Sequence, residues 1–500
     1  METLLTNLAH GFGVALTFQN LLFALIGCLI GTAIGVLPGI GPVATISLLL
    51  PITFGQPATT AIIMLAGIYY GAQYGGSTTA ILLNLPGEVS AVVTTLEGYK
   101  MARNGRAGAA LAIAALGSFF AGSVATILVA ASGPLLTSVA LSFGPADYFS
   151  LMLLGLIISA VLAQGSVLKS ISMVVMGVGL GLVGTDVQTG QQRFTFGVPE
   201  LSDGIGFVAL AMGMFGIAEI ILNLERPEAR SVLKTRVDSL WLTKEEWKRA
   251  TPSVLRGTLT GSMLGILPGG GAALSSFASY MMERKISRGR HLFGTGAIEG
   301  VAGPEAANNA ASQTSFIPLL TLGIPSNAVM ALMVGALIIQ GIQPGPRMVE
   351  AQPDLFWGLI ASMWVGNLML LVINLPMIGM WVKLLQVPYK FLYPSILVFC
   401  CIGSYSINNN VFDVYMTVLF AVLGYVFSKL RMEPAPMLIG FVLGPMMEEH
   451  LRRAMLLSRG DPMVFVERPI SATLLGIGAL ALAAMLLPNL RKGKDAALAG

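Results

Sequence analysis

Long apolar stretches separated by short polar segments recur along the whole chain. A helix of ~20 residues spans the ~30 Å hydrocarbon core of a bilayer, so the pattern predicts about twelve membrane elements. A transmembrane barrel would instead show alternating segments of ~10 residues. We therefore expect an all-α, polytopic integral membrane protein. The main stretches lie at about 18–37, 58–84, 108–132, 147–163, 167–185, 204–223, 254–280, 304–322, 324–342, 354–380, 391–405, 411–429, 433–446 and 470–487.

Two Pro-Gly elements interrupt this pattern, each at the end of a long apolar stretch. They are Leu37-Pro38-Gly39 and Leu267-Pro268-Gly269. Proline removes a backbone donor and glycine permits left-handed backbone, so both elements should end helices. Unwound backbone at membrane depth is tolerated only where it is buried in protein or lines a cavity. We therefore expect broken helices and re-entrant hairpins, with 18–51 and 254–281 as the two hairpins.

Similar residues recur at nearly constant spacing, which indicates an internal duplication. Pro268 follows Pro38 by 230 residues, Pro325 follows Pro86 by 239, Gly366 follows Gly122 by 244 and Pro388 follows Pro145 by 243. Paired interruptions at corresponding points of two halves indicate the binding site of a secondary transporter. The predicted organisation is a first repeat at 1–223, a charged linker at 224–252, a second repeat at 253–446 and a terminal segment with the last transmembrane helix at 447–500.

The distribution of Lys and Arg predicts the orientation in the membrane. No basic residue precedes Lys100, whereas 100–106 and the linker are basic, so both should be cytoplasmic and the N-terminus periplasmic. Corresponding loops differ between the halves: 52–57 has no basic residue but 283–290 has four, and basic 100–106 corresponds to 340–350 with only Arg347. Inverted-topology repeats predict this reversal. The assigned topology would place the basic residues Arg452, Arg453 and Arg459 in the periplasm, against the positive-inside rule. The membrane crossings after Pro434 are therefore not assigned.

The helix-breaking Pro-Gly elements, called breakers below, and the polar residues between them form the candidate substrate site. Free N–H groups at the N-termini of half-helices bind anions, and glycines let the backbone approach a ligand. Polar side chains in hydrocarbon are costly unless paired, so those between the breakers are further candidates, with helix–helix hydrogen bonding as the alternative. The predicted substrate-binding residues are Pro38, Gly39, Gly41, Gly269, Gly270, Gly271, Ser77, Thr78, Asn308, Asn309 and Ser312.

Each half has a second helix breaker, Leu85-Pro86-Gly87 in the first and Ile324-Pro325-Ser326 in the second. Neutral oxygens near these second breakers are candidate ligands for a coupling cation. Carbonyls, hydroxyls and amides suit a hard monovalent cation such as sodium. The predicted cation-binding residues are Asn84, Pro86, Ser315, Pro325 and Asn327. Glu305 follows Pro304, and its favoured interpretation is first-turn stabilisation of a helix that starts there, as it is for Glu88 after Pro86-Gly87. Glu219 and Asp413 are alternative ion-relay groups.

Other classes of function find little support in the sequence. Cys28, Cys400 and Cys401 lie inside apolar stretches, and the three histidines are scattered, so no metal site or catalytic residue is predicted. Gly-x-Ser-x-Gly is absent from the sequence, which disfavours an intramembrane hydrolase. The formal net charge of +4 is spread over loops and indicates no nucleic-acid partner.

Several motifs resemble the large membrane subunit of the tripartite tricarboxylate transporters, the TctA family. They are Gly35-Val-Leu-Pro-Gly-Ile-Gly-Pro42, Ile68-Tyr-Tyr-Gly-Ala-Gln-Tyr-Gly-Gly-Ser77, Ile81-Leu-Leu-Asn-Leu-Pro-Gly87, Gly265-Ile-Leu-Pro-Gly269, Gly300-Val-Ala-Gly-Pro-Glu-Ala-Ala-Asn-Asn-Ala310 and Ile317-Pro-Leu-Leu-Thr-Leu-Gly-Ile-Pro325. The resemblance runs nearly end to end. Two departures are Ser326-Asn327, where the family usually has Gly, and Glu97, where Asp is common.

The resemblance implies a multi-pass permease subunit of the bacterial inner membrane. Its implied partners are a small membrane subunit with about four helices and a periplasmic solute-binding protein. Its implied activity is symport of carboxylates with a cation, expected to be sodium, without another cofactor. A stand-alone secondary carrier or channel for organic anions is the alternative, and it would need neither partner.

Overall fold

A computed structural model describes residues 2–37, 41–140, 142–163, 166–186, 188–225, 240–267, 271–384 and 389–486. Helices make up almost all of this described part, which has one short antiparallel sheet, β1 (Gly184–Thr185) with β2 (Gln192–Arg193). Among the described residues, six helices are long and apolar enough to cross a membrane, and four shorter apolar helices accompany them. The prediction of an all-α polytopic membrane protein is confirmed.

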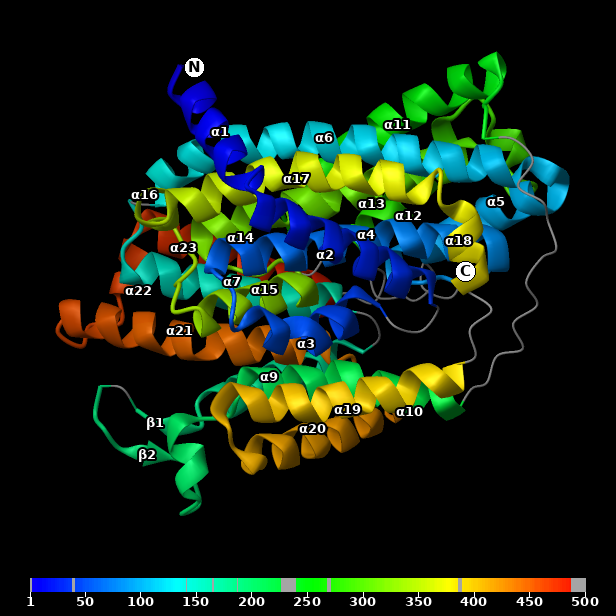
Figure 1. Ribbon diagram of the computed structural model, residues 1–500. Coiled ribbons are helices and arrows are strands. Elements are labelled where there is room, and N and C mark those ends of the chain that lie inside the picture. Colours follow the sequence, from blue (N-terminus) through cyan, green and yellow to red (C-terminus); the bar gives the residue numbers. More distant parts are fainter. Residues whose placement is uncertain are drawn as a thin grey trace.

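The first half of the chain forms a bundle of long helices and a more peripheral group (Figure 1). The bundle helices are α1 (Glu2–Ala15), α2 (Phe18–Val36), α3 (Pro42–Thr53), α4 (Ala58–Leu83), α5 (Val92–Met101) and α6 (Ala107–Ala140). The peripheral group is α7 (Pro145–Leu162), α8 (Val167–Gly181), α9 (Phe207–Ala211) and α10 (Ala218–Glu225), with a π-helical segment, Met212–Ile217, joining the last two.

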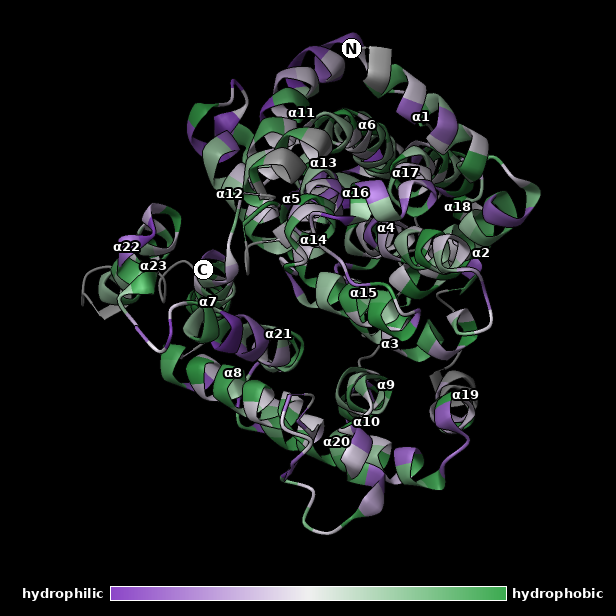
Figure 2. Cartoon of the chain, turned by 90° about the vertical axis from the view of Figure 1, so that its left-hand side faces the viewer, coloured by the Kyte–Doolittle hydropathy of each residue, from purple (hydrophilic) through white to green (hydrophobic). Residues whose placement is uncertain are grey.

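The second half supplies the remaining helices of both groups. They are α11 (Lys244–Leu264), α12 (Gly271–Ile286), α13 (Glu299–Thr314), α14 (Phe316–Leu322), α15 (Ala328–Ile339), α16 (Met348–Ala351), α17 (Pro353–Asn374), α18 (Ile378–Leu384), α19 (Tyr389–Asn408), α20 (Val411–Lys429), α21 (Ala435–Leu457), α22 (Val464–Glu467) and α23 (Pro469–Leu486). Viewed along the helices, peripheral elements such as α8 are strongly apolar (Figure 2). An apolar outer surface is what contact with lipid requires.

Helix α11 begins inside the predicted linker. Its capping box consists of Thr243 and Glu246, whose side chains each accept a hydrogen bond from the other's backbone N–H. This reciprocal pairing satisfies two free donors and sets the start of the helix at Lys244. Residues 226–239 of the predicted linker lie outside the described part of the chain.

Glycines let α2 lie against α4, and α11 against α13, with their backbones almost in contact. A β-carbon at Gly31 would lie 2.3 Å from the carbonyl oxygen of Ile68, and one at Gly261 would lie 2.1 Å from that of Ala307. Gly261 follows Gly31 by 230 residues and Ala307 follows Ile68 by 239, the same spacings as the two pairs of breakers. The same close helix pair therefore occurs once in each half.

The corresponding helices α6 and α17 cross in opposite directions. Gly122 lies against Asn367, whereas Gly133, further along α6, lies against Phe356, nearer the start of α17. The Asn367 amide also donates to Ser123 Oγ at 3.3 Å, and these two residues are 244 positions apart. Corresponding positions of antiparallel helices thus meet each other.

The peripheral helices of each half pack against peripheral elements of the other half. A β-carbon at Gly181 of α8 would lie 2.5 Å from the carbonyl oxygen of Phe441 on α21, and one at Gly424 of α20 would lie 2.8 Å from that of Met214. Gly424 follows Gly181 by 243 residues, and Phe441 follows Met214 by 227.

Both second breakers end their helices in the same backbone conformation. Asn84, after α4, has φ 59°, and Gly323, after α14, has φ 74°. Four residues later, Glu88 and Asn327 are extended, with φ −150° and −157°, and each precedes a new helical turn. The prediction that these Pro-containing elements break helices is confirmed.

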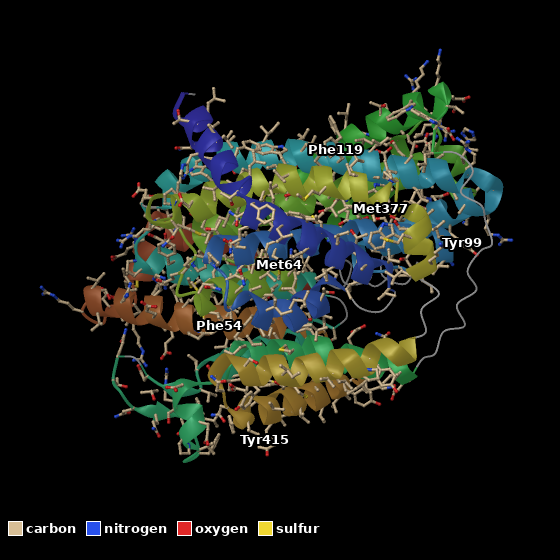
Figure 3. All side chains as sticks on the ribbon, viewed as in Figure 1. Phe54, Met64, Tyr99, Phe119, Met377 and Tyr415 are labelled. Atoms are coloured by element: carbon tan, nitrogen blue, oxygen red, sulfur yellow. The ribbon has the colours of Figure 1, made fainter. Side chains whose placement is uncertain are left out.

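The two ends of the bundle differ in charge. At one end, Asn104 donates to the carbonyl oxygen of Thr295 at 3.0 Å, which joins basic loop 100–106 to the segment after α12. At the other end, Gln340 donates to the carbonyl oxygen of Thr53 at 3.0 Å, which joins the two loops poor in basic residues. Phe54 and Tyr99 lie toward opposite ends in Figure 3. Corresponding loops of the two halves therefore lie at opposite ends.

Candidate functional site

The first breakers lead into the N-termini of two helices. Pro38, Gly39, Gly269 and Gly270, four of the predicted substrate-binding residues, lie outside the described residues. Helix α2 ends at Val36 and α11 at Leu264, so the predicted helix ends are confirmed.

Gly41 and Gly271 follow these breakers and are described. Gly41 precedes α3, and Gly271 is the first residue of α12 with φ 51°, a left-handed conformation that favours glycine. Thr45 Oγ1 donates to the Gly41 carbonyl at 2.9 Å, and Ser275 Oγ donates to the Gly271 carbonyl at 2.8 Å. The first backbone N–H groups of α3 and α12 have no acceptor within their own helices.

The polar side chains predicted between the breakers are buried inside the protein. Every residue of α13 is buried, and so is α4 from Thr60 to Leu83. The five predicted residues on these helices have exposed fractions of at most 4%: Ser77, Thr78, Asn308, Asn309 and Ser312. Buried polar groups need partners, so the question is what each one contacts.

Glu305 is held between three helices by hydroxyl groups. Ser77 Oγ of α4 donates to its Oε2 at 2.6 Å, and Thr94 of α5 donates to its Oε1. The carboxyl group is 1% exposed. The expectation that Pro304 and Glu305 start a helix is wrong, because α13 begins at Glu299 and Pro304 lies within it. Packing on all sides stabilises a helix through this proline, which local sequence disfavours.

Glu88 belongs to a second polar group on the same helices. Asn308 Nδ2 of α13 donates to its Oε1 at 3.2 Å, and Ser90 hydrogen-bonds to it as well. Ser90 Oγ also lies 3.0 Å from Gln73 Oε1 of α4. Glu88 lies beside Gly76, where a β-carbon would come 3.0 Å from its Cγ. Glu305 and Glu88 therefore lie beside consecutive residues of α4, Ser77 and Gly76.

Two further predicted substrate residues complete this polar interior. Asn309 Nδ2 donates to Ser118 Oγ of α6 at 2.6 Å, and Ser312 Oγ donates to the carbonyl oxygen of Asn308 at 2.9 Å. The Asn308 side-chain oxygen has no hydrogen-bond partner among the described residues. It is therefore free to accept a hydrogen bond from a ligand or to contact a cation.

The predicted cation residues of the second half lie together. Asn327 Nδ2 donates to Ser315 Oγ at 3.3 Å, and Ser315 Oγ lies 3.2 Å from the carbonyl oxygen of Gly265, the residue after α11. Pro325 is buried next to them, and Asn327 lies against Gly271. The predicted cation residues of the first half behave differently: Asn84 is exposed and Pro86 is half-buried, so the structure places only the second-half residues in a cluster.

A small cavity adjoins Glu305. It encloses about 10 Å³, enough for one water-sized occupant. The lining residues come from α4, α6, α13 and the end of α17, and they are Tyr74, Ser77, Thr78, Leu111, Ala114, Ala115, Ser118, Glu305, Asn374, Leu375 and Ile378. Among the described residues, no group of three or more His, Cys, Asp and Glu side chains lies close enough to hold a metal ion.

Sequence reasoning missed several polar residues around Glu305. Thr94 and Ser118 lie among mainly apolar residues, and Asn374 ends an apolar helix, so no local pattern singles them out. One signal was present in the sequence: 300–311 is rich in Ala and Gly on every helical face. A helix segment without a large side chain on any face is one packed closely on all sides, which places Glu305 inside the protein.

Comparison with known proteins gives consistent results. The family model of the Tripartite tricarboxylate transporter TctA family matches residues 21–439. The chain is 60% identical over 495 residues, 99% of each chain, to an uncharacterized 52.8 kDa protein in the TAR-I ttuC' 3'region of Agrobacterium vitis. It is 62% identical over 235 residues to an uncharacterized protein in the TAR-II ttuC' 3'region of the same organism, which covers 47% of this chain and 97% of that protein. No solved structure matches.

Proposed function

Because this chain belongs to the tripartite tricarboxylate transporter TctA family, we propose that it is the large permease subunit of a binding-protein-dependent secondary transporter. It imports tricarboxylates or related carboxylates across the bacterial inner membrane, and its transport is coupled to a cation gradient. The expected cation is sodium. Its partners are a small membrane subunit with about four helices, comparable to a minimal bundle, and a periplasmic solute-binding protein that delivers the substrate.

The observation that carries this proposal is the pair of broken helices buried inside the bundle. Helices α4 and α13 are buried along almost their whole length yet carry polar side chains. A left-handed residue and a proline follow α4 directly, and in the second half they follow α14, the short helix after α13. Discontinuous helices of this kind form midplane binding sites in secondary transporters. The starts of α3 and α12 supply free N–H groups and a favourable dipole for a carboxylate.

An inverted-topology repeat explains how two such helices meet. The antiparallel crossing of α6 and α17 and the separation of corresponding loops to opposite ends both support it. The basic end, with loop 100–106, would be cytoplasmic by the positive-inside rule. The two halves would then approach the substrate from opposite sides of the membrane, as alternating access requires.

Reconstitution with both partners tests this proposal. Vesicles that contain this chain, its small membrane subunit and the cognate binding protein should take up a carboxylate only under an inward sodium gradient. Uptake should persist when the pH gradient is collapsed at constant membrane potential. A prior binding screen of the periplasmic protein against di- and tricarboxylates selects the substrate. Sodium-independent uptake driven by a pH gradient would contradict the assignment of the cation.

A stand-alone carrier or channel is the second candidate. The same vesicles prepared without the binding protein distinguish it, because a stand-alone protein would transport at an unchanged rate. The family supports the tripartite form.

A further inference from the structure

The cavity beside Glu305 has the lining of a monovalent-cation site. We infer that Glu305, Ser77 and Asn374 bind one sodium ion there, an inference that rests on the cation coupling in the proposed function. The site differs from the cluster of Ser315, Pro325 and Asn327, and it is built by α4, α13 and the end of α17.

Asn374 supplies an oxygen that the protein itself leaves without a partner. Its Nδ2 donates to the carbonyl oxygen of Leu370 at 2.9 Å, which sets the orientation of the amide. Its Oδ1 has no hydrogen-bond partner among the described residues, although the residue is only 4% exposed and lines the cavity. A buried acceptor without a partner is costly, so a cation bound to the Asn374 side-chain oxygen would supply the missing partner.

Glu305 supplies the negative charge. None of the ion pairs among the described residues involves it, and its two oxygens contact only the hydroxyls of Ser77 and Thr94. A buried carboxylate needs a neutralising partner, and ionisable residues inside membranes mark ion pathways. One carboxylate matches one positive charge, because a divalent ion would leave the site with a net charge.

The remaining lining groups fit the same ion. Ser77, Thr78 and Ser118 add hydroxyl oxygens to the carboxylate and the amide, and hard cations prefer oxygen ligands. The cavity offers about 10 Å³ to a water-sized occupant, which is enough for one dehydrated sodium ion.

The site occurs only once, although the chain repeats. At the repeat spacings of 239 and 244 residues, Glu305 corresponds to Ala66, Ser77 to Phe316 and Asn374 to Ala130. All three counterparts are apolar, so the other half provides no equivalent ligands. The inference therefore assigns one sodium ion per chain to this cavity.

Sodium titration of the purified full-length chain in detergent tests the site. NaCl is exchanged for choline chloride at constant ionic strength. Sodium binding is measured as the increase in unfolding temperature and as radioactive sodium retained by the protein. The wild-type chain should bind saturably. Glu305→Gln and Asn374→Leu should each weaken sodium affinity roughly 10-fold or more, as removal of coordinating groups does in other metal sites. Glu350→Gln, which neutralises an exposed carboxylate on helix α16, is the control and should bind normally.

The outcomes separate this site from the proposed function. Unchanged sodium affinity in both variants would overturn the site, even if uptake by the three-component system stays sodium-dependent. Sodium-independent uptake together with normal sodium binding would overturn the coupling and leave the site intact. If Glu305→Gln does not fold, Asn374→Leu decides, because it retains the carboxylate. No saturable sodium binding by the wild-type chain, with a pH-dependent stability that Glu305→Gln removes, would assign the site to a proton and refute the inference.

Discussion

Gly31 illustrates how a single atom decides helix packing in this protein. Its position on α2 faces the backbone of α4, where a β-carbon would lie 2.3 Å from the carbonyl oxygen of Ile68. That atom is backbone and cannot turn away as a side chain can, so α2 and α4 would have to separate. Closely packed small residues of this kind hold membrane helices together.

Gly31→Ala should therefore destabilise the protein by about 1–3 kcal/mol, the usual cost of overpacking. Gly261→Ala, the corresponding change on α11, should behave alike because its β-carbon would meet Ala307 at 2.1 Å. Thermal unfolding in detergent measures both. The control is Gly13→Ala on α1, which has no atom within 4 Å of the added carbon and should be neutral or stabilising. Equal unfolding temperatures in all three variants would refute the packing argument.

At the scale of one element, the start of α11 combines a capping box with an ion pair. Arg106, in the turn before α6, donates to Glu246 Oε1 at 2.6 Å, so the pair connects two helices. Partial burial disfavours the charge of Glu246, but hydrogen bonds from the Thr243 N–H and from Arg106 outweigh it. The pKa of this carboxyl consequently lies below its usual value.

This lowered pKa predicts how stability depends on pH. A carboxyl group with a lowered folded-state pKa stabilises the protein above its unfolded-state pKa, about 4.3, and the stabilisation disappears as the pH falls through the folded-state value. Wild type should therefore unfold at a higher temperature than Glu246→Gln at pH 7, and the difference should shrink below about pH 4.3. Glutamine still fits a capping box, so this variant removes mainly the charge.

Glu245→Gln is the matched control for this pH dependence. Glu245 lies on the same helical turn but is exposed. Its substitution should give a smaller difference from wild type at pH 7, because an exposed charge contributes little. A difference between wild type and Glu246→Gln that stays constant down to pH 3 (~1 unit below its reference pKa) would contradict the assigned role.

At the scale of the whole molecule, corresponding segments lie at opposite ends of the bundle. Gly55 and Lys285 are 230 residues apart and both are exposed; Gly55 follows α3, and Lys285 lies in the last turn of α12. Gly55 is a better reporter than neighbouring Thr53, which is 3% exposed. Under an inverted repeat, the two positions face opposite sides of the membrane.

Gly55→Cys and Lys285→Cys should accordingly react with a membrane-impermeant thiol reagent from opposite sides, with Lys285→Cys on the cytoplasmic side. The background needs Cys401→Ser, because Cys401 is exposed whereas Cys28 and Cys400 are buried. The background protein without a new cysteine is the control and should stay unlabelled. Reaction of both cysteines from one side would rule out the inverted repeat.

Local chemistry let the sequence by itself determine the fold class and the helix breaks. Apolar stretches of membrane length predict spanning helices, and proline and glycine act on the backbone at their own positions, so Leu83, Leu264 and Leu322 end helices near the predicted breakers. The spacings of 230 and 239 residues, from which the sequence predicts an internal duplication, recur in the contacts of Gly31 and Gly261. These features depend on neighbours in the chain or on its periodicity.

Only the tertiary structure decided which polar groups face one another. Glu305 and Ser77 are 228 residues apart, and Asn309 and Ser118 are 191 apart, so no local pattern links them. Pro304 favours a helix start by itself, yet α13 runs through it, because burial on every face of α13 outweighs a local preference. Asn374 became a candidate ligand only when packing placed it beside Glu305 and left its oxygen without a partner. Chemistry that depends on distant residues is set by packing and not by the order of residues along the chain.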